Sequence, residues 1–197
     1  MKSIKITVCA IFSILTLSCS NSKNDKYIGN SAPEVKAEKC LDKWIEKKGV
    51  SWEELRLVFE NYYAEGNISD PSEPVADQYN DILNFWAQPT KRFPSFRQRN
   101  KAAEIQAKLG LSDEDIRKKA HLDCLTNAYV ENKSIVDTAS AFYAFGATME
   151  SLKEIPNVSP GLVARALNFY VDKTDLNREL YQKTIILLYL FEMKMNL

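Results

Sequence analysis

The residues that usually carry enzyme chemistry are scarce in this chain of 197 residues. His121 is the only histidine, which excludes a histidine-rich metal site and the His-Glu-x-x-His motif of metalloproteases. No serine lies in a Gly-x-Ser-x-Gly turn, and the chain has no glycine-rich phosphate loop. His121 falls beside the apolar face of a predicted helix, so we expect a structural or surface role for it. The motifs therefore predict no catalytic residue, no metal ligand and no cofactor.

Carboxylates are the remaining source of chemistry, because a glycosidase needs only an acid and a partner carboxylate. Glu150-Ser151 resembles the Glu-Ser pair of lysozyme-like lytic transglycosylases, which are helical and often lipoproteins. This resemblance implies an enzyme acting on cell-wall glycan, with Glu150 as its acid. The glycine-rich sequence that follows the pair in that family is absent here, and residues 153–155 continue a helix. The favoured interpretation of Glu150 is a solvated residue near a helix end.

The four cysteines separate by position. Cys9 lies in an apolar N-terminal run, and Cys19 follows that run after one serine, Ser18. Cys40 and Cys124 remain as a pair, and both fall on apolar helix faces. In an oxidising compartment we expect a disulfide between them. It would contribute about 4–5 kcal/mol by the chain-entropy model. Two buried free thiols are the alternative.

The strongest local clue to binding is a basic segment at residues 91–101, which contains no acidic residue. Two phenylalanines lie among its cations, an arrangement that could bind an acidic protein surface or lipid phosphates. The alternative is a loop whose rings pack on the body and whose cations neutralise the acidic residues of 51–89. The candidate partner-binding residues are Lys91, Arg92, Phe93, Phe96, Arg97, Arg99 and Lys101.

Residues 1–18 have the features of an export signal: basic Lys2 and Lys5, then an apolar run over residues 6–17. The run of 12 residues is shorter than the roughly 20 that span a bilayer. The sequence Leu-Thr-Leu-Ser-Cys at 15–19 resembles the lipobox of bacterial lipoproteins, although Thr16 stands where leucine is most common. The resemblance implies that Cys19 carries diacylglycerol and becomes the N-terminus. Ordinary signal-peptidase cleavage near Ser18 and Ser20 is the alternative.

Residues 19–35 are polar and are predicted to be the lipidated N-terminus and a flexible tether, with an r.m.s. span of roughly 20 Å. Ser20 after the cysteine is similar to enteric lipoproteins sorted to the outer membrane. The resemblance thus implies a lipid-anchored envelope protein, with the outer membrane favoured. A secreted or periplasmic protein is the alternative.

Composition predicts the kind of body that follows. Without residues 1–18 the chain has a formal charge of −2, since only Lys2 and Lys5 are lost from a neutral total. A nucleic-acid-binding protein usually has a net basic surface, so we expect no nucleic-acid partner. Few glycines and prolines, with abundant Ala, Leu, Lys and Glu, favour helices.

Apolar periodicity predicts an all-α domain over residues 36–197, with seven or eight helices and one disulfide staple. Ser51 with Glu54 has capping-box spacing, and Ser159-Pro160 is a helix start. A segment rich in small residues predicts a central helix, and the last helix is expected to be buried on most sides. Expected helices cover residues 33–48, 51–66, 75–87, 97–109, a segment from 112 through 128, 134–155, a segment from 159, and 174–195.

These observations favour a lipid-anchored, non-enzymatic module that binds another envelope or exported protein. It would act either as an accessory subunit or as an immunity-type inhibitor of an exported toxin. The alternatives are the glycan-acting enzyme named above and a carrier for an apolar ligand, which would need a continuous internal cavity.

Overall fold

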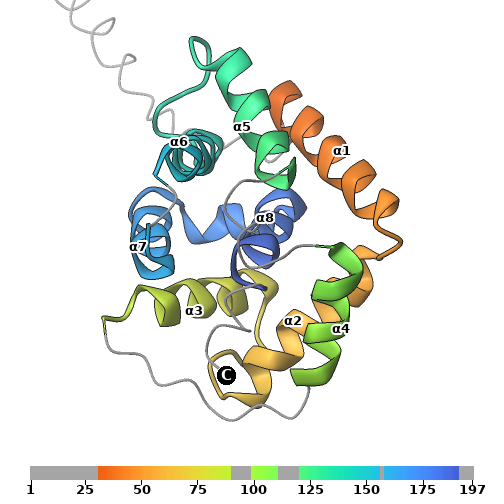
Figure 1. Cartoon of the computed structure of the whole chain (residues 1–197). Helices are drawn as coiled ribbons and strands as arrows, with labels where there is room; N and C mark the ends of the chain where they lie inside the picture. The colour runs from red at the N-terminus through yellow and green to blue at the C-terminus, as the bar shows by residue number, and fades with distance from the viewer. Residues whose placement is uncertain (1–30, 90–98, 111–119, 156–157, 191–197) are drawn as a thin grey trace, which may run out of the picture. The chain divides into compact units, whose positions relative to one another are not determined.

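The computed structural model describes residues 31–89, 99–110, 120–155 and 158–190, which belong to one compact unit, residues 31–197. Their secondary structure is entirely helical, in agreement with the predicted all-α class (Figure 1). The elements are α1 (Ala32–Lys47), α2 (Trp52–Glu65), α3 (Val75–Ala87), α4 (Arg99–Leu109), α5 (Ala120–Asn132), α6 (Ala141–Glu154), α7 (Pro160–Tyr170), the 3-10 helix η2 (Lys173–Asn177) and α8 (Glu179–Tyr189).

Helix starts follow the local signals in the sequence. The Ser51 hydroxyl accepts a hydrogen bond from the Glu54 amide at 3.1 Å, as the capping spacing predicts. Ser159 caps α7, and Pro160 occupies its first turn. α1 begins at Ala32, so residues 32–35 of the predicted tether are helical.

Two predicted helices differ from their expected bounds. The helix predicted for 134–155 begins only at Ala141, because Ser140 caps it and Asp137 accepts the Ala139 amide in a preceding turn. The helix predicted for 174–195 is divided, because Asp172 caps the 3-10 helix η2 and α8 starts anew at Glu179. Residues 191–195 of that prediction lie outside the described residues. The helix expected from Ser112 is described only from Ala120 onward.

α8 lies at the centre of the body, and its residues 180–187 are all buried. On one side the Tyr181 ring stacks on Phe145 of α6, with centroids 4.7 Å apart. On another, Tyr189 stacks on Trp86 of α3 at 4.9 Å. The predicted burial of the last helix is therefore confirmed.

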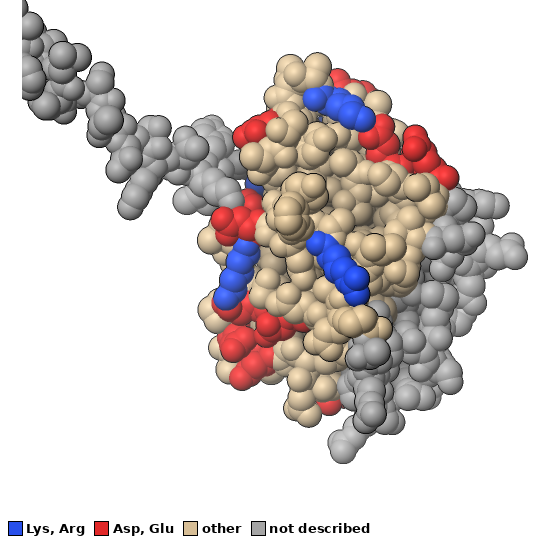
Figure 2. Space-filling view, turned by 90° about the vertical axis from the view of Figure 1, so that its left-hand side faces the viewer, with Lys and Arg blue, Asp and Glu red and all other residues tan. Residues whose placement is uncertain are grey.

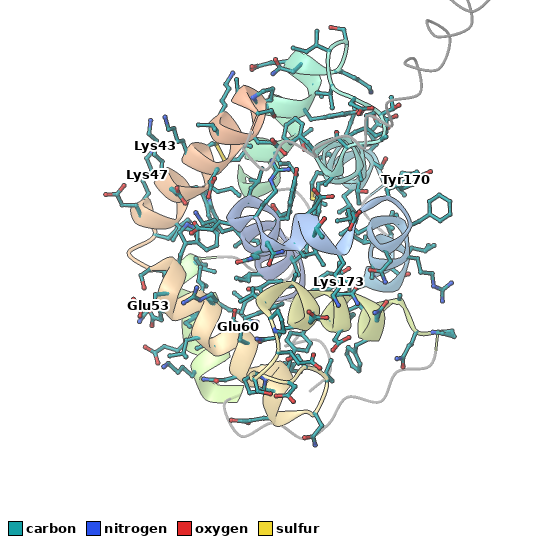
Figure 3. All side chains as sticks on the ribbon, turned by 180° about the vertical axis from the view of Figure 1, so that it is seen from behind. Lys43, Lys47, Glu53, Glu60, Tyr170 and Lys173 are labelled. Carbon is teal, nitrogen blue, oxygen red and sulfur yellow. A yellow bond between two sulfur atoms is a disulfide. The ribbon has the colours of Figure 1, made fainter. Side chains whose placement is uncertain are left out.

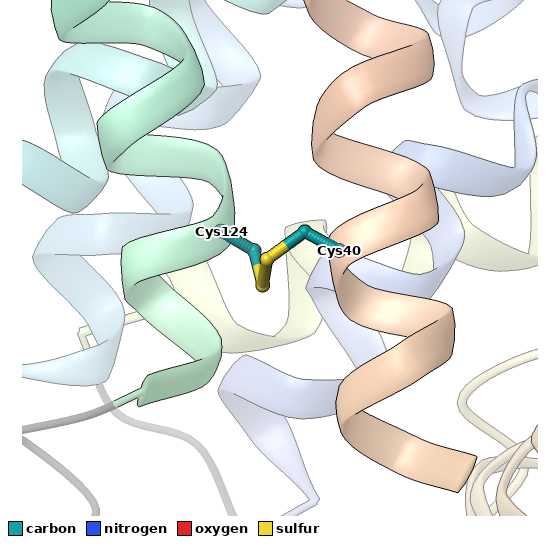
Figure 4. Close-up of a disulfide and its surroundings, with 2 residues drawn as sticks. All are labelled: Cys40 and Cys124. Atoms are coloured by element: carbon teal, nitrogen blue, oxygen red, sulfur yellow. A yellow bond between two sulfur atoms is a disulfide. The ribbon is translucent and has the colours of Figure 1, made fainter.

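The predicted disulfide is present and joins α1 to α5 through Cys40 and Cys124 (Figure 4). Cys124 is buried, as expected, and Ala128 beside it also lies in the core. Cys40 differs from the prediction, because it is exposed at the edge of the α1–α5 contact, while Leu41 and Ile45 face the core.

The small residues of α6 allow a close helix contact. A Cβ atom added to Gly146 would lie 2.5 Å from the Cβ of Tyr129 in α5, closer than real Cβ atoms approach. Tyr129 is fully buried, so its ring fills the space that the glycine leaves. Gly146 therefore sets the distance between α5 and α6.

Replacing Gly146 with alanine should lower the free energy of unfolding by about 1–3 kcal/mol, because overpacking outweighs alanine's helix preference. Denaturant unfolding measures this change. In the double variant Gly146→Ala with Tyr129→Leu, the loss should be smaller than the sum of the two single losses. Additive losses would mean that the two side chains do not compete for space.

Candidate functional site

A groove of about 390 Å³ lies on the surface between α6 and α7. Its α6 wall is a stripe of small side chains, and its α7 wall carries Leu162, Ala166 and Tyr170. We call it the α6–α7 groove. The residues that line it on the α6 side and between the helices are Tyr143, Ala144, Ala147, Thr148, Ser151, Leu152 and Val158, with Val163 on the α7 side.

The small α6 residues share one face because they recur at helical spacing, at positions 144, 147, 148 and 151. Two of them carry hydroxyls, but those hydroxyls are bound to their own helix. Thr148 donates to the Ala144 carbonyl at 2.7 Å, and Ser151 donates to the Ala147 carbonyl at 2.9 Å. A molecule bound in the groove would therefore meet mainly carbon atoms on the α6 wall and would form few hydrogen bonds there.

The outer side of α7 is apolar as well. Phe169 is 80% exposed, and Leu162 and Tyr170 are each 57% exposed. The rings of Phe169 and Tyr170 meet edge to face at 4.8 Å. Figure 2 shows the face that α6 and α7 present, a broad uncharged area crossed near its centre by one basic side chain, with further charged groups toward its edges. Apolar patches of this kind mark interaction surfaces on soluble proteins.

The inner side of α7 is fastened to α3. Arg165 donates through Nε to the carbonyl of Ala87, the last residue of α3, at 2.8 Å. Asn168 donates to the side chain of Asn84 at 2.9 Å. Val163 and Leu167 enter the core. α7 is thus held firmly, while its apolar outer side remains open.

A second, more polar cavity of about 210 Å³ lies over Lys183 of α8. The Lys183 ammonium contacts Glu38 at 3.0 Å, Asp42 at 2.9 Å and Glu179 at 3.2 Å. Burial alone would lower the pKa of Lys183, but hydrogen bonds to these carboxylates outweigh it and raise the pKa above its usual value. Lys183 therefore stays protonated, which is the opposite of what a nucleophilic amine needs.

A buried cluster joins the start of α1 to α8. The Glu34 carboxylate accepts hydrogen bonds from Tyr181, pairs with Arg178 and accepts the Ser31 amide. Burial alone would raise the pKa of Glu34, yet the hydrogen bonds from Tyr181, Ser31 and Arg178 hold it below its usual value. This cluster fixes the first turn of α1 on the core.

Of the sequence-predicted site residues, the structure joins Cys40 to Cys124 and describes two others, Arg99 and Lys101. Cys19 and the segment 90–98, with Lys91, Arg92, Phe93, Phe96 and Arg97, lie outside the described residues. Arg99 begins α4, and Lys101 is exposed on it. His121 lies in the first turn of α5. Glu150 lines neither cavity and pairs with Lys133 at 2.8 Å.

Sequence reasoning missed the α6–α7 groove, although a signal for it exists. Residues 160–170 carry apolar side chains around nearly the whole helix, with Arg165 as their only charge. A helix that is apolar all round is expected to be covered on every side. Among the described residues, α7 is covered only on its inner side. The difference between its apolar sequence and its partial burial identifies this surface.

In the described part of the chain, no group of three or more His, Cys, Asp or Glu residues could hold a metal ion. The helices described there are too short or too polar to cross a membrane. Comparisons with known protein families, curated proteins and solved structures found no match.

Glu34 should make stability depend on pH in the acid range. Because its pKa is lowered on folding, its contribution is complete above about pH 4.5, its usual value, and is lost as the pH falls through the lowered value. Glu34→Gln should lower the free energy of unfolding by about 1–3 kcal/mol at neutral pH. The difference from the unmodified protein should shrink at pH 3.

Denaturant unfolding at the two pH values tests this expectation. Glu46→Gln is the matched control, because Glu46 is exposed on the same helix. If Glu34→Gln lowers the free energy of unfolding by the same amount at both pH values, ionisation of Glu34 does not explain its contribution.

Proposed function

We propose that this chain is a lipid-anchored protein of the cell envelope that acts as a non-enzymatic interaction module. The α6–α7 groove would hold an amphipathic helix of another envelope or exported protein. The observation that carries the proposal is the apolar outer side of α7, with Phe169 80% exposed beside a groove of small residues. The partner is either a complex to which the chain is an accessory subunit or a toxin that it inhibits.

A helix is the occupant that suits this groove best. Small residues at helical spacing on α6 let another backbone approach closely, while Leu162 and Tyr170 form a raised wall on the other side. Large apolar side chains spaced along one helix face would fill such a groove, as in known helix-in-groove complexes. Arg165 has no carboxylate partner among the described residues, so a partner helix with an acidic residue beside its apolar face would complement it.

A carrier for an apolar small molecule is the second candidate, because about 390 Å³ lies within the usual range of about 300–1,000 Å³ for ligand pockets. The groove is open at the surface rather than a continuous internal cavity. Its α6 hydroxyls are bound to their own helix, so they add little to fix a ligand's orientation. A glycan-acting enzyme has less support, since Glu150 is paired with Lys133 outside both cavities.

The anchor is tested first. Replacing Cys19 with serine removes the sulfur that would carry the lipid, so the chain should move from the membrane fraction to the soluble fraction. The membranes are washed at high ionic strength so that charge attraction does not retain the protein. If the variant stays with the membranes as the parent does, the lipoprotein proposal is wrong.

The groove is tested by filling it. A photo-crosslinking residue at position 162 should give one protein adduct in intact cells, and Ala147→Phe should reduce that adduct at least about tenfold, as for a lost hot spot. Ala107→Phe on α4 is the matched control, because Ala107 is exposed far from the groove in sequence and should leave the adduct unchanged.

Each outcome of this experiment separates the candidates. An adduct that survives Ala147→Phe would overturn the groove as the binding site. The absence of any protein adduct would overturn the interaction module and favour the small-molecule carrier.

A further inference from the structure

Three lysines form a basic stripe on the outer side of α1. Lys39, Lys43 and Lys47 recur every four residues, so they lie on successive turns of one helix face, and all three are exposed. Figure 3 shows Lys43 and Lys47 pointing away from the body. We call Lys39, Lys43 and Lys47 the lysine stripe.

The charges of α1 are segregated. Glu34, Glu38 and Asp42 also recur every four residues, but they face α8 and are bound there by Arg178, Tyr181 and Lys183. The stripe lysines form no ion pair with any described residue, whereas Lys36 at the start of the helix pairs with Glu131. Glu46 is the one exposed carboxylate on the same helix. The outer side of α1 therefore keeps a net positive charge.

We propose that the lysine stripe binds the anionic phospholipid surface of the membrane that holds the lipid anchor. The inference rests on the proposed anchor at Cys19. Only 12 residues, 20–31, separate Cys19 from the start of α1. Twelve residues reach at most about 40 Å when fully extended. The proposed anchor would therefore keep α1 within that distance of the bilayer, so that the stripe can reach the lipid surface.

Charge supplies the attraction once the stripe lies within a Debye length of the lipid surface, about 10 Å at 0.1 M ionic strength. A lysine near an anionic membrane contributes about fivefold to binding, which corresponds to about 1 kcal/mol. The diacylglycerol proposed at Cys19 has two acyl chains, which give stable anchoring by themselves. The stripe would therefore not be needed to retain the protein, but it would fix which side of the body faces the lipid.

The orientation has a consequence for the α6–α7 groove. α1 and α7 lie on opposite sides of the body in Figure 1, and Figure 3 places Lys43 and Lys47 on one side and Tyr170 on the other. The Cys40–Cys124 disulfide holds α1 on α5, so the stripe cannot move independently of the body. With the stripe on the membrane, the groove points away from the bilayer, toward a protein partner.

The test uses the chain from residue 19 onward with Cys19→Ser, so that no lipid contributes; residues 31–197 form a compact unit of their own. Its sedimentation is measured with vesicles of phosphatidylglycerol mixed with phosphatidylcholine, and with phosphatidylcholine vesicles alone. We expect binding only to the anionic vesicles, with a loss at high salt. The triple variant Lys39→Gln, Lys43→Gln, Lys47→Gln should bind about 10- to 100-fold more weakly.

A second triple variant has the same net charge but leaves the stripe intact: Lys108→Gln, Lys133→Gln, Lys173→Gln. It should bind about as well as the parent if position, not total charge, decides. Equal loss in both variants, equal binding to neutral vesicles or no binding to either vesicle type would overturn the proposal. The assay involves neither lipidation nor a protein partner. A negative result would therefore contradict the lysine-stripe proposal alone and would not bear on the lipid anchor or the groove.

Discussion

The structure depends on the burial of α8 along most of its length. Residues 180–187 of this helix are all removed from water, although it lies in a body of modest size. An isolated helix of 11 residues is not stable in water, so neighbours must supply its stability. They do so on several sides: Phe145 of α6 and Trp86 of α3 stack on its tyrosines, and Gln106 of α4 donates to the Leu190 carbonyl at 2.8 Å. The positions of the surrounding helices follow from the need to cover α8.

The buried polar groups on α8 determine which face of α1 packs against it. Lys183 and the Tyr181 hydroxyl are buried, and each needs a carboxylate partner at close range. α1 supplies these partners from one of its faces, through Glu34, Glu38 and Asp42. That demand draws the acidic residues of α1 inward and leaves its lysines outside. A requirement of the core therefore produces the basic surface beside the predicted tether.

Two helix caps predicted from the sequence are confirmed, one helix break was missed, and the features that depend on how helices cross were not predicted. Ser51 and Ser159 cap their helices because the interaction needs only a hydroxyl and a nearby amide. The break between η2 and α8 was missed, because apolar periodicity over 174–195 does not register the turn that Asp172 caps. The pairing of Cys40 with Cys124 was predicted by elimination, but the exposure of Cys40 was not, since it depends on how α1 and α5 cross. The α6–α7 groove was missed for the same reason, because its two walls meet only in the folded chain.

α7 and α8 carry similarly apolar sequences of 11 residues, yet only α8 is covered. Both helices contact the core, so the difference does not arise from a lack of packing on the inner side of α7, where Val163 and Leu167 are buried. Exposed aromatic residues such as Phe169 contribute nothing to folding while they remain in water, and they favour aggregation. Apolar residues at these positions therefore contribute stability only when another surface covers α7. The α6 hydroxyls beside it already donate hydrogen bonds within their own helix. The covering surface would therefore bind chiefly through shape complementarity and apolar contacts rather than through hydrogen bonds. This combination is the physical reason for interpreting the groove as a place for a partner and not as a reaction centre.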